Sequence, residues 1–234
     1  MPKASSTAFA GFSPKTVAFL RGLEANNNRD WFQRNKARYE SDVREPALDF
    51  IAAMGTALKR CAPHLEAVPK AVGGSLMRVH RDTRFAKDKR PYKTNVGIHF
   101  RHEVGKDVHA PGLYFHIDPE RVFLGAGLWH PEAEVLAKIR GSIVDDGAAW
   151  KRARDDKRFR GVWEIDGESL SRPPRGFDKD HPYVEDLKRK DFIAVMDLRF
   201  KDIQGKDVVA RVTEACAAAT PWMRFLCRAC ELPY

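Results

Sequence analysis

The residues best suited to bind an anion are concentrated between Arg78 and Thr94. Seven residues of this segment are Lys or Arg, and only Asp82 and Asp88 are acidic. Arginine guanidinium groups hold phosphate or carboxylate through paired hydrogen bonds, and lysines add point charge. Because converging cations repel one another, an anion among them would stabilise the segment. The ligand-binding residues predicted here are Arg78, Arg81, Arg84, Lys87, Lys89, Tyr92 and Lys93.

The same charges have a second explanation. Asp82 and Asp88 are anions already present in the segment, so salt bridges within it would satisfy the cations without a ligand. The segment joins two predicted strands with roughly a dozen residues, whereas a simple hairpin needs about two to five. Phe85, Pro91 and Tyr92 favour an ordered loop. The sequence therefore predicts a loop that is either a ligand site or a structural clamp.

The strands that flank this loop predict where other polar residues lie. Four segments in the middle of the chain alternate apolar and polar residues, which is typical of strands with one buried face. The last two are joined by a short turn and should form an antiparallel hairpin. The four segments are Ser75–Arg81, Asn95–Arg101, Gly112–Asp118 and Arg121–Leu128.

Alternation places one polar set on the face opposite the core. If Met77 and Val79 face inward, and the apolar residues of the next strands do likewise, the outward set is Arg78, His80, His99, Arg101, Tyr114 and His116. Imidazoles titrate near neutral pH and serve as general acids or bases. Arg101 therefore joins the ligand-binding set, and the candidate catalytic residues are His80, His99, His116 and Tyr114. The alternative is that this set is simply the exposed face of a half-buried sheet.

Two further segments carry chemically useful residues. The irregular stretch 170–182 contains Arg172 and Arg175, and Arg175 is predicted as ligand-binding because it would reach the same anion as the 78–94 loop. Gly125 and Gly127, on a predicted strand, would let a ligand or another backbone approach closely. No cysteine or histidine spacing matches a zinc site, so neither a metal nor a cofactor is predicted.

Helix signals lie on both sides of the predicted strands. Ser13 and Pro14 suit the first positions of a helix, and a helical stripe continues, with a kink or restart at Pro46, as far as Pro63. Later helices are predicted at 131–144, 183–190, 207–219 and 221–230.

The order of these elements predicts the fold class. We expect an α+β fold in which an antiparallel, possibly mixed, sheet of about five strands from the middle of the chain is covered by N- and C-terminal helices. The fifth strand is Phe192–Phe200. A single domain is expected over residues 1–234, with a short flexible N-terminus at about residues 1–8.

Composition narrows the class of protein. The chain has 234 residues, and the 43% that are hydrophobic suffice for a core. Its net charge of +9 attracts phosphates of any kind, nucleic acid included, without choosing among them. No run of about 18 apolar residues is present, so no membrane partner is expected. The start lacks the apolar stretch of a signal peptide, and the cytoplasm is the expected location.

These motifs resemble a family called domain of unknown function 2461, found in bacteria and fungi. The most specific match runs from Gly74 through Arg81-Asp82-Thr83-Arg84-Phe85 to Pro91-Tyr92-Lys93-Thr94. Other matching pieces are Phe9–Phe12, Asn26–Phe32 with Tyr39, Gly125–Trp129 with Pro131, and Pro173–Phe177, where the family has Lys in place of Arg175. The resemblance covers nearly the whole chain and implies one full-length domain. It implies no reaction, substrate or cofactor.

Three functions are compatible with these residues. In the first, which we favour, the chain binds and can act on a small phosphate-bearing or otherwise anionic ligand through the 78–94 loop. In the second it is a nucleic-acid-binding module, with Phe85, Tyr92 or Trp129 stacked on bases. In the third, an arginine–aspartate network only orders the loop. A small anionic ligand is thus a more expected partner than nucleic acid, and neither a reaction nor an oligomeric state is predicted.

Overall fold

A six-stranded antiparallel sheet runs through the middle of the molecule, in the spatial order β1-β2-β3-β4-β6-β5. The computed structural model describes residues 9–104 and 110–234, so the flexible N-terminus expected at about residues 1–8 lies outside the described residues. The predicted α+β class is confirmed, and all the strand pairs described are antiparallel. The strands are β1 Leu65–Glu66, β2 Val96–His102, β3 Gly112–Ile117, β4 Val122–Leu128, β5 Glu164–Asp166 and β6 Phe192–Leu198.

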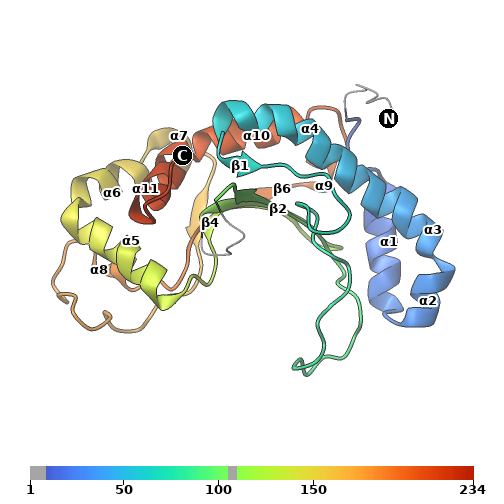
Figure 1. Ribbon diagram of the computed structural model, residues 1–234, viewed down its shortest axis with the longest axis horizontal. Coiled ribbons are helices and arrows are strands. Elements are labelled where there is room, and N and C mark those ends of the chain that lie inside the picture. Colours follow the sequence, from blue (N-terminus) through green and yellow to red (C-terminus); the bar gives the residue numbers. More distant parts are fainter. Residues whose placement is uncertain (1–8, 105–109) are drawn as a thin grey trace.

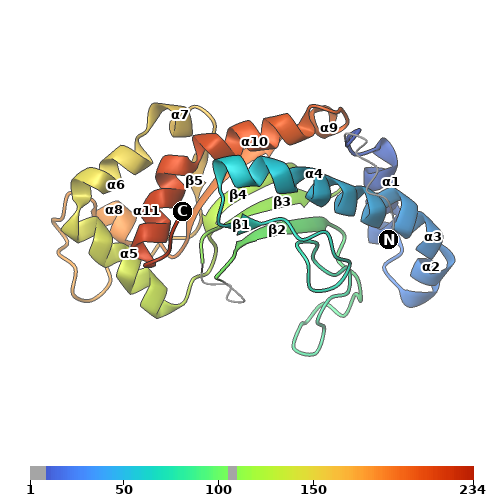
Figure 2. The ribbon, with the colours of Figure 1, turned by 45° about the horizontal axis from the view of Figure 1, so that its top comes forward.

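One face of the sheet forms the core. Alternate residues of the central strands are buried, and Ile98 of β2 lies beside Phe115 of β3. Helices α4 (Glu45–Cys61) and α10 (Val208–Ala218) cover this face (Figures 1 and 2). Phe50 of α4 packs on Phe115, with ring centroids 4.9 Å apart. The opposite face is not covered by any helix in the described part of the chain (Figure 1).

The N-terminal helices form a lobe at one end of the strands (Figure 1). Helix α1 (Pro14–Ala25) begins where the sequence predicts, because the Ser13 side chain accepts a hydrogen bond from the Lys15 N–H. Asn28 caps α2 (Arg29–Arg34) in the same manner. Helix α3 (Lys36–Tyr39) leads into a π-helical turn, Glu40–Arg44, directly before Pro46 and the restart of the helix as α4.

A second lobe lies at the other end of the strands (Figure 1). The sequence does not predict its helices α6 and α7, because the stretch 146–160 is dominated by charged residues. Trp150 and Phe159 are nevertheless fully buried there. The lobe consists of α5 Ala133–Asp145, α6 Gly147–Arg154, α7 Lys157–Arg160, α8 Val184–Leu187 and α11 Thr220–Ala229, while α9 Phe200–Ile203 links β6 to α10. None of the described helices is long and apolar enough to cross a membrane.

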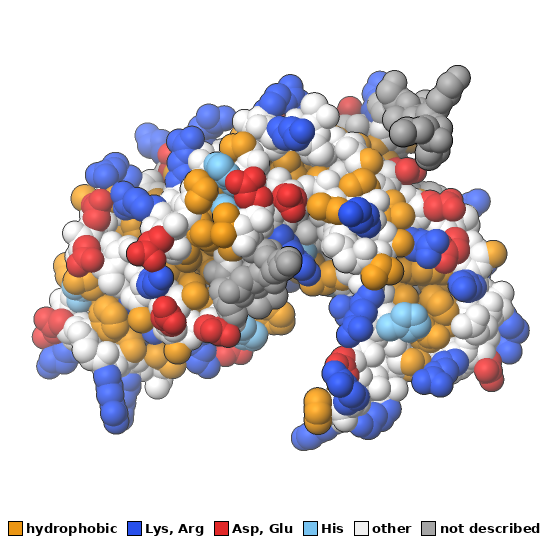
Figure 3. Space-filling view, in the orientation of Figure 1, with side chains coloured by type: hydrophobic (Ala, Val, Ile, Leu, Met, Phe, Trp, Pro, Cys, Tyr) orange, Lys and Arg blue, Asp and Glu red, His pale blue; other side chains and the backbone are white. Residues whose placement is uncertain are grey.

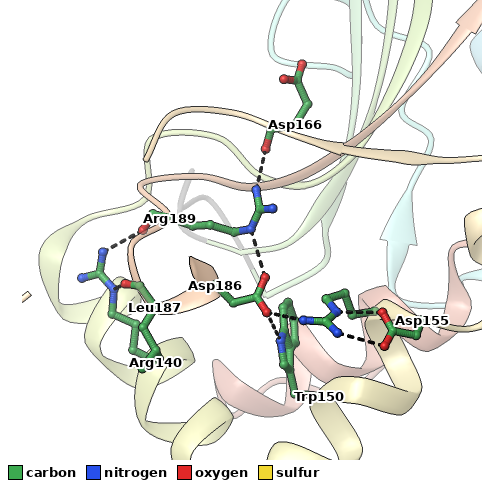
Figure 4. Close-up of polar contacts among 8 residues, drawn as sticks. Arg140, Trp150, Asp155, Asp166, Asp186, Leu187 and Arg189 are labelled. Carbon is green, nitrogen blue, oxygen red and sulfur yellow. Dashed lines mark hydrogen bonds and ion pairs between the residues drawn. The ribbon is translucent and has the colours of Figure 1, made fainter. Parts of the chain in front are cut away.

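A buried polar cluster joins the second lobe to the edge of the sheet (Figure 4). The Asp186 carboxylate accepts hydrogen bonds from Trp150 Nε1 at 2.8 Å and Arg154 Nη1 at 2.6 Å. Arg189 Nε also donates to Asp186, at 3.3 Å, and Arg189 Nη1 donates to the Asp166 carbonyl of β5, at 3.4 Å. The buried Arg140 of α5 donates to the carbonyls of Leu187 and Arg189.

The sheet and its two lobes form an arch. Figures 1 and 3 show the uncovered face of the sheet on the inside of this arch, hollowed between the lobes. The 78–94 loop projects beside the hollow on the side of the N-terminal lobe, and Lys and Arg side chains gather on it (Figures 1 and 3). We call the uncovered side the open face; it is the side of the sheet that carries Gly97, His99, Tyr114, His116 and Phe123.

Replacing Asp186 with Ala tests the buried cluster. The change leaves Trp150 Nε1 and two arginines without their carboxylate, so we expect the free energy of unfolding to fall by about 3–5 kcal/mol, as measured by urea denaturation. Asp155→Ala is the matched control, because Asp155 is the other carboxylate on Arg154 and is 42% exposed. Its loss should cost about 0–1 kcal/mol. Equal losses in the two variants would contradict this account.

Candidate functional site

A chain of hydrogen bonds runs along the open face on β3. Tyr114, His116 and Asp118 are spaced by two residues, so their side chains leave the strand on one face. The Tyr114 hydroxyl oxygen lies 2.9 Å from His116 Nδ1, and His116 Nε2 lies 3.0 Å from Asp118 Oδ2. The Asn95 amide nitrogen lies 3.5 Å from the same Nδ1. We call Tyr114, His116 and Asp118 the relay.

The partners of the relay fix the positions of its protons. Burial alone would raise the pKa of the Asp118 carboxyl, but hydrogen bonds from the backbone N–H groups of Glu120 and Arg121 and from His116 outweigh burial and lower that pKa. The carboxylate therefore accepts, His116 Nε2 carries the hydrogen, and Nδ1 accepts from Tyr114. Burial lowers the pKa of His116, against the effect of Asp118, and raises the pKa of Tyr114 to about 12. The resting relay at neutral pH is thus tyrosine, neutral histidine and aspartate.

Glycines beneath the rings make room for this arrangement. A Cβ at Gly97, on the neighbouring strand β2, would lie 2.7 Å from the Tyr114 hydroxyl oxygen. A Cβ at Gly112 would lie 2.5 Å from His99 Nε2. Both rings therefore lie over backbone that carries no side chain. Phe123 of β4 extends the layer of rings, because it stacks on the His116 ring at 4.6 Å between centroids.

His99 and Arg101 lie beside the relay on β2. Arg101 Nε is 3.4 Å from His99 Nδ1, so this ring nitrogen accepts. Burial, and then the charge of Arg101, lowers the pKa of His99 to about 4. The His99 ring lies 6.5 Å from the Tyr114 ring. His99 is therefore a neutral ring at physiological pH, with Nδ1 accepting from Arg101 and the hydrogen on Nε2.

The 78–94 loop contains a salt-bridge network of its own. Asp82 pairs with Arg84 at 2.7 Å, and Asp88 pairs with Arg81 at 2.5 Å and with Arg90 at 2.8 Å. Arg84 lowers the pKa of Asp82, and Arg90 and Arg81 lower the pKa of Asp88. Both carboxylates are thus fully used inside the loop, as the structural-clamp hypothesis requires.

The base of the loop is anchored on the N-terminal lobe. Tyr92 forms an antiparallel bridge with His80, and its ring stacks on Phe32 at 4.1 Å between centroids. The Asn27 side chain exchanges two hydrogen bonds with the Tyr92 backbone, at 3.0 and 3.1 Å. Tyr92 is only 3% exposed. This residue, predicted to bind ligand, is placed inside the anchor, where its ring does not face the open side of the sheet.

The structure separates His80 from the other candidate catalytic residues. Leu76 is buried and pairs with Ile98, but Val79, of the opposite parity, also packs against the core, so the segment 75–81 keeps no single strand phase. It makes only isolated bridges, where a strand was expected. The His80 ring lies 5.1 Å from the Tyr92 ring, away from the group formed by His99, Tyr114 and His116.

Arg78 and Lys93 are left outside the loop's network. Burial lowers the pKa of Lys93, and the charge of Arg78 lowers it further. Within residues 9–104 and 110–234, no carboxylate lies at ion-pair distance from either. Asn95, two residues after Lys93, lies 3.5 Å from His116 Nδ1, so this part of the chain runs beside the relay.

The remaining predicted ligand-binding residues are dispersed. Lys87 is exposed on the loop, and Lys89 donates to the Thr83 carbonyl at 3.0 Å. Arg175 is exposed in the stretch 171–182, which lies on the second lobe, at the other end of the arch from the 78–94 loop (Figures 1 and 2). Arg175 therefore does not share one anion with the loop, because the length of the strands separates the two lobes.

Two residues of this group were missed in the sequence. Asp118 has the character of a turn residue, and its Oδ1 atom does accept from the turn backbone. The available signal was the Tyr-x-His-x-Asp spacing from 114 to 118, which extends the strand's outward face by one position. Asn95 gave no comparable signal. Among the described residues, no group of three or more His, Cys, Asp and Glu side chains is arranged to hold a metal ion.

Comparison with known proteins gives one match. The model of a family described as a conserved hypothetical protein (DUF2461) matches residues 15–225. No curated protein and no solved structure matches the chain.

The lowered pKa of His99 predicts how stability depends on pH. The unfolded chain protonates this ring below about pH 6.5, whereas the folded protein does so only near pH 4. Between these values the unfolded state binds more protons, so stability should fall as pH decreases from about 6.5 to 4, by up to about 3 kcal/mol. His99→Gln should flatten this part of the profile in urea denaturation. A His99 ring signal that titrates near pH 6.5 by NMR would refute the assignment.

Gly97→Ala tests the packing beneath the relay. The new methyl group displaces the Tyr114 hydroxyl from His116, and we expect a loss of about 1–3 kcal/mol of stability with the loss of this hydrogen bond. The ¹⁵N chemical shift of His116 Nδ1 should move at the same time. Gly125→Ala is the matched control, because its Cβ would meet only the Tyr114 Cβ, at an ordinary 3.7 Å. An unchanged Nδ1 signal in Gly97→Ala would show that the methyl group is accommodated elsewhere.

Proposed function

The chain belongs to the DUF2461 family, whose description assigns no reaction, and from the site itself we propose that it binds a small phosphate-bearing or otherwise anionic ligand beside the relay. Arg78 and Lys93 hold the anionic group. Tyr114 and His116 lie where they can accept a proton from the bound molecule. The cytoplasm, where phosphorylated metabolites are abundant, is the proposed location.

One observation supports this proposal: among the described residues neither Arg78 nor Lys93 pairs with a carboxylate, and the charge of Arg78 adds to the lowering of the pKa of Lys93. Arg81, Arg84 and Arg90 have carboxylate partners in the loop. A purely structural network therefore explains those three arginines and leaves the Arg78–Lys93 pair unexplained. A bound anion would offset the repulsion between the two cations and raise the pKa of Lys93.

The proton chemistry follows from the resting state of the relay. The Tyr114 oxygen donates its hydrogen to His116 and keeps lone pairs available for a ligand. When a ligand group gives its proton to that oxygen, the tyrosine hydrogen passes to His116 Nδ1, and Asp118 stabilises the imidazolium ion that forms. Because burial raises the pKa of Tyr114, the two transfers are expected to be concerted, without a free tyrosinate.

A thermal-shift panel with orthophosphate, sugar phosphates and mononucleotides tests the proposal. A ligand at about 100 times its Kd stabilises by roughly 2.7 kcal/mol, which is about 5–10 °C for a chain of this size. Arg78→Gln and Lys93→Met should each abolish the shift. Tyr114→Phe should retain it, because the hydroxyl group moves protons and does not hold the anion.

Arg211→Gln is the control, since Arg211 is exposed on α10, the helix that covers the other face of the sheet. This variant should respond to ligand as the wild type does. The proposal fails if no anion in the panel shifts the wild type, or if Arg78→Gln and Lys93→Met respond as Arg211→Gln does.

A further inference from the structure

The cations of the open face lie too far apart for one small ligand. Lys93 and Arg101 both lie on the chain that forms β2, eight residues apart. The stretch of β2 from Val96 to Arg101 alone spans roughly 17 Å at about 3.3 Å per residue, and Lys93 lies beyond it across a bend at residues 94–95. A single phosphate at Lys93 therefore cannot touch Arg101. A chain of phosphates that runs along the strand direction can touch both.

Exposed aromatic rings lie beyond both ends of the line from Lys93 to Arg101. Phe85 is 94% exposed on the 78–94 loop, and Trp129 is 70% exposed. Trp129 directly follows β4. The pairing of Val122 with Ile117, and of Ile117 with Val96, puts the start of β4 at the loop end of the sheet and its last residue at the other end. Neither ring is needed to fill the core, and a large exposed ring is a contact surface when a partner can stack on it.

We propose that the ligand of the open face is a single-stranded nucleic acid. Arg78, Lys93 and Arg101 contact successive phosphates, while Phe85 and Trp129 stack on bases at the two ends of the site. This inference rests on the proposed function, since it extends the bound anion from one phosphate to several. Single strands fit because both faces of their bases are free to stack on aromatic side chains, whereas bases within a duplex are already stacked.

Charge restricts the path of the strand. Glu164, Asp166 and Asp197 line a hollow of about 450 Å³ on the β5–β6 side of the sheet. Arg121 also lines this hollow and pairs with Asp197 at 2.7 Å, which leaves Glu164 and Asp166 to repel phosphates. The backbone of the nucleic acid therefore lies on the β2 side. Arg84, whose guanidinium lies 5.8 Å from the Phe85 ring centroid, keeps positive charge beside the stacking surface.

An anionic membrane surface fits the same residues less well. A bilayer is flat, and the cations at Lys93 and Arg101 belong to the open face, which is hollowed between the two lobes (Figure 3). Phe85 is flanked by charged residues and offers one ring for insertion, which is far less apolar surface than stable anchoring requires. The concave face favours a narrow, flexible polyanion.

Fluorescence anisotropy with a labelled 12-nucleotide single strand tests the inference, with the corresponding mononucleotide as competitor. The oligonucleotide should bind at least 10-fold more tightly than the mononucleotide. Phe85→Ala and Trp129→Ala should each weaken oligonucleotide binding by about 5- to 100-fold, the range expected for one stacked base. Arg101→Gln should weaken it too and reduce the slope of log Kd against log salt. Mononucleotide binding should survive Trp129→Ala.

Val144→Ala, which removes an exposed apolar side chain from α5, is the control and should bind as the wild type does. If mononucleotide and oligonucleotide bind equally tightly, or Phe85→Ala and Trp129→Ala leave the Kd unchanged, the inference is overturned and the small-anion site stands. If oligonucleotide binding does not respond to Arg78→Gln or Lys93→Met, the proposed function fails. Binding to phosphatidylserine vesicles that depends on Phe85, without binding to the oligonucleotide, would overturn the inference in favour of a lipid surface.

Discussion

Alternate side chains of β2, β3 and β4 are buried against α4 and α10, so the side chains between them lie on the opposite face of the sheet. Once Ile98, Phe115 and Leu124 are buried on one side, their neighbours along the strands emerge on the other. That second face carries no helix in the described part of the chain, so its polar side chains bond to one another, to water or to a ligand. The relay forms under this constraint: three residues of one strand meet because the period of a strand is two.

Partial burial determines the protonation states of the side chains on the open face. His99 and His116 are neutral and Tyr114 is protonated, because burial removes the water that would stabilise the charged form of each side chain. Asp118 alone stays ionised, since backbone N–H groups of the turn replace its water. The face therefore carries neutral rings beside one ionised carboxylate, with Arg101 on β2 and Arg121 over the Phe123 ring as cations.

The parts of this arrangement that follow from strand period could be predicted from the sequence. Tyr114, His116 and His99 share a face as expected, because β2 and β3 pair regularly. The segment 75–81 could not be placed in the same way, since it makes only isolated bridges and both Leu76 and Val79, of opposite parity, pack against the core. Arg175 was misplaced because composition shows that a loop is basic but not which end of the sheet it lies at. Asp118 was overlooked because it lies between a strand and a turn, and its residue type is explained by the turn alone.

The bond between Asn27 and Tyr92 joins residues 65 positions apart. The loop cannot take its final shape before the connection between α1 and α2 has docked on it, since the salt bridges within the loop are mostly exposed and too weak to hold it alone. Contacts of such separation form late and raise the entropic barrier to folding. The 78–94 loop therefore depends on the first two helices for its position, and a chain without them would lose the anchor at Tyr92.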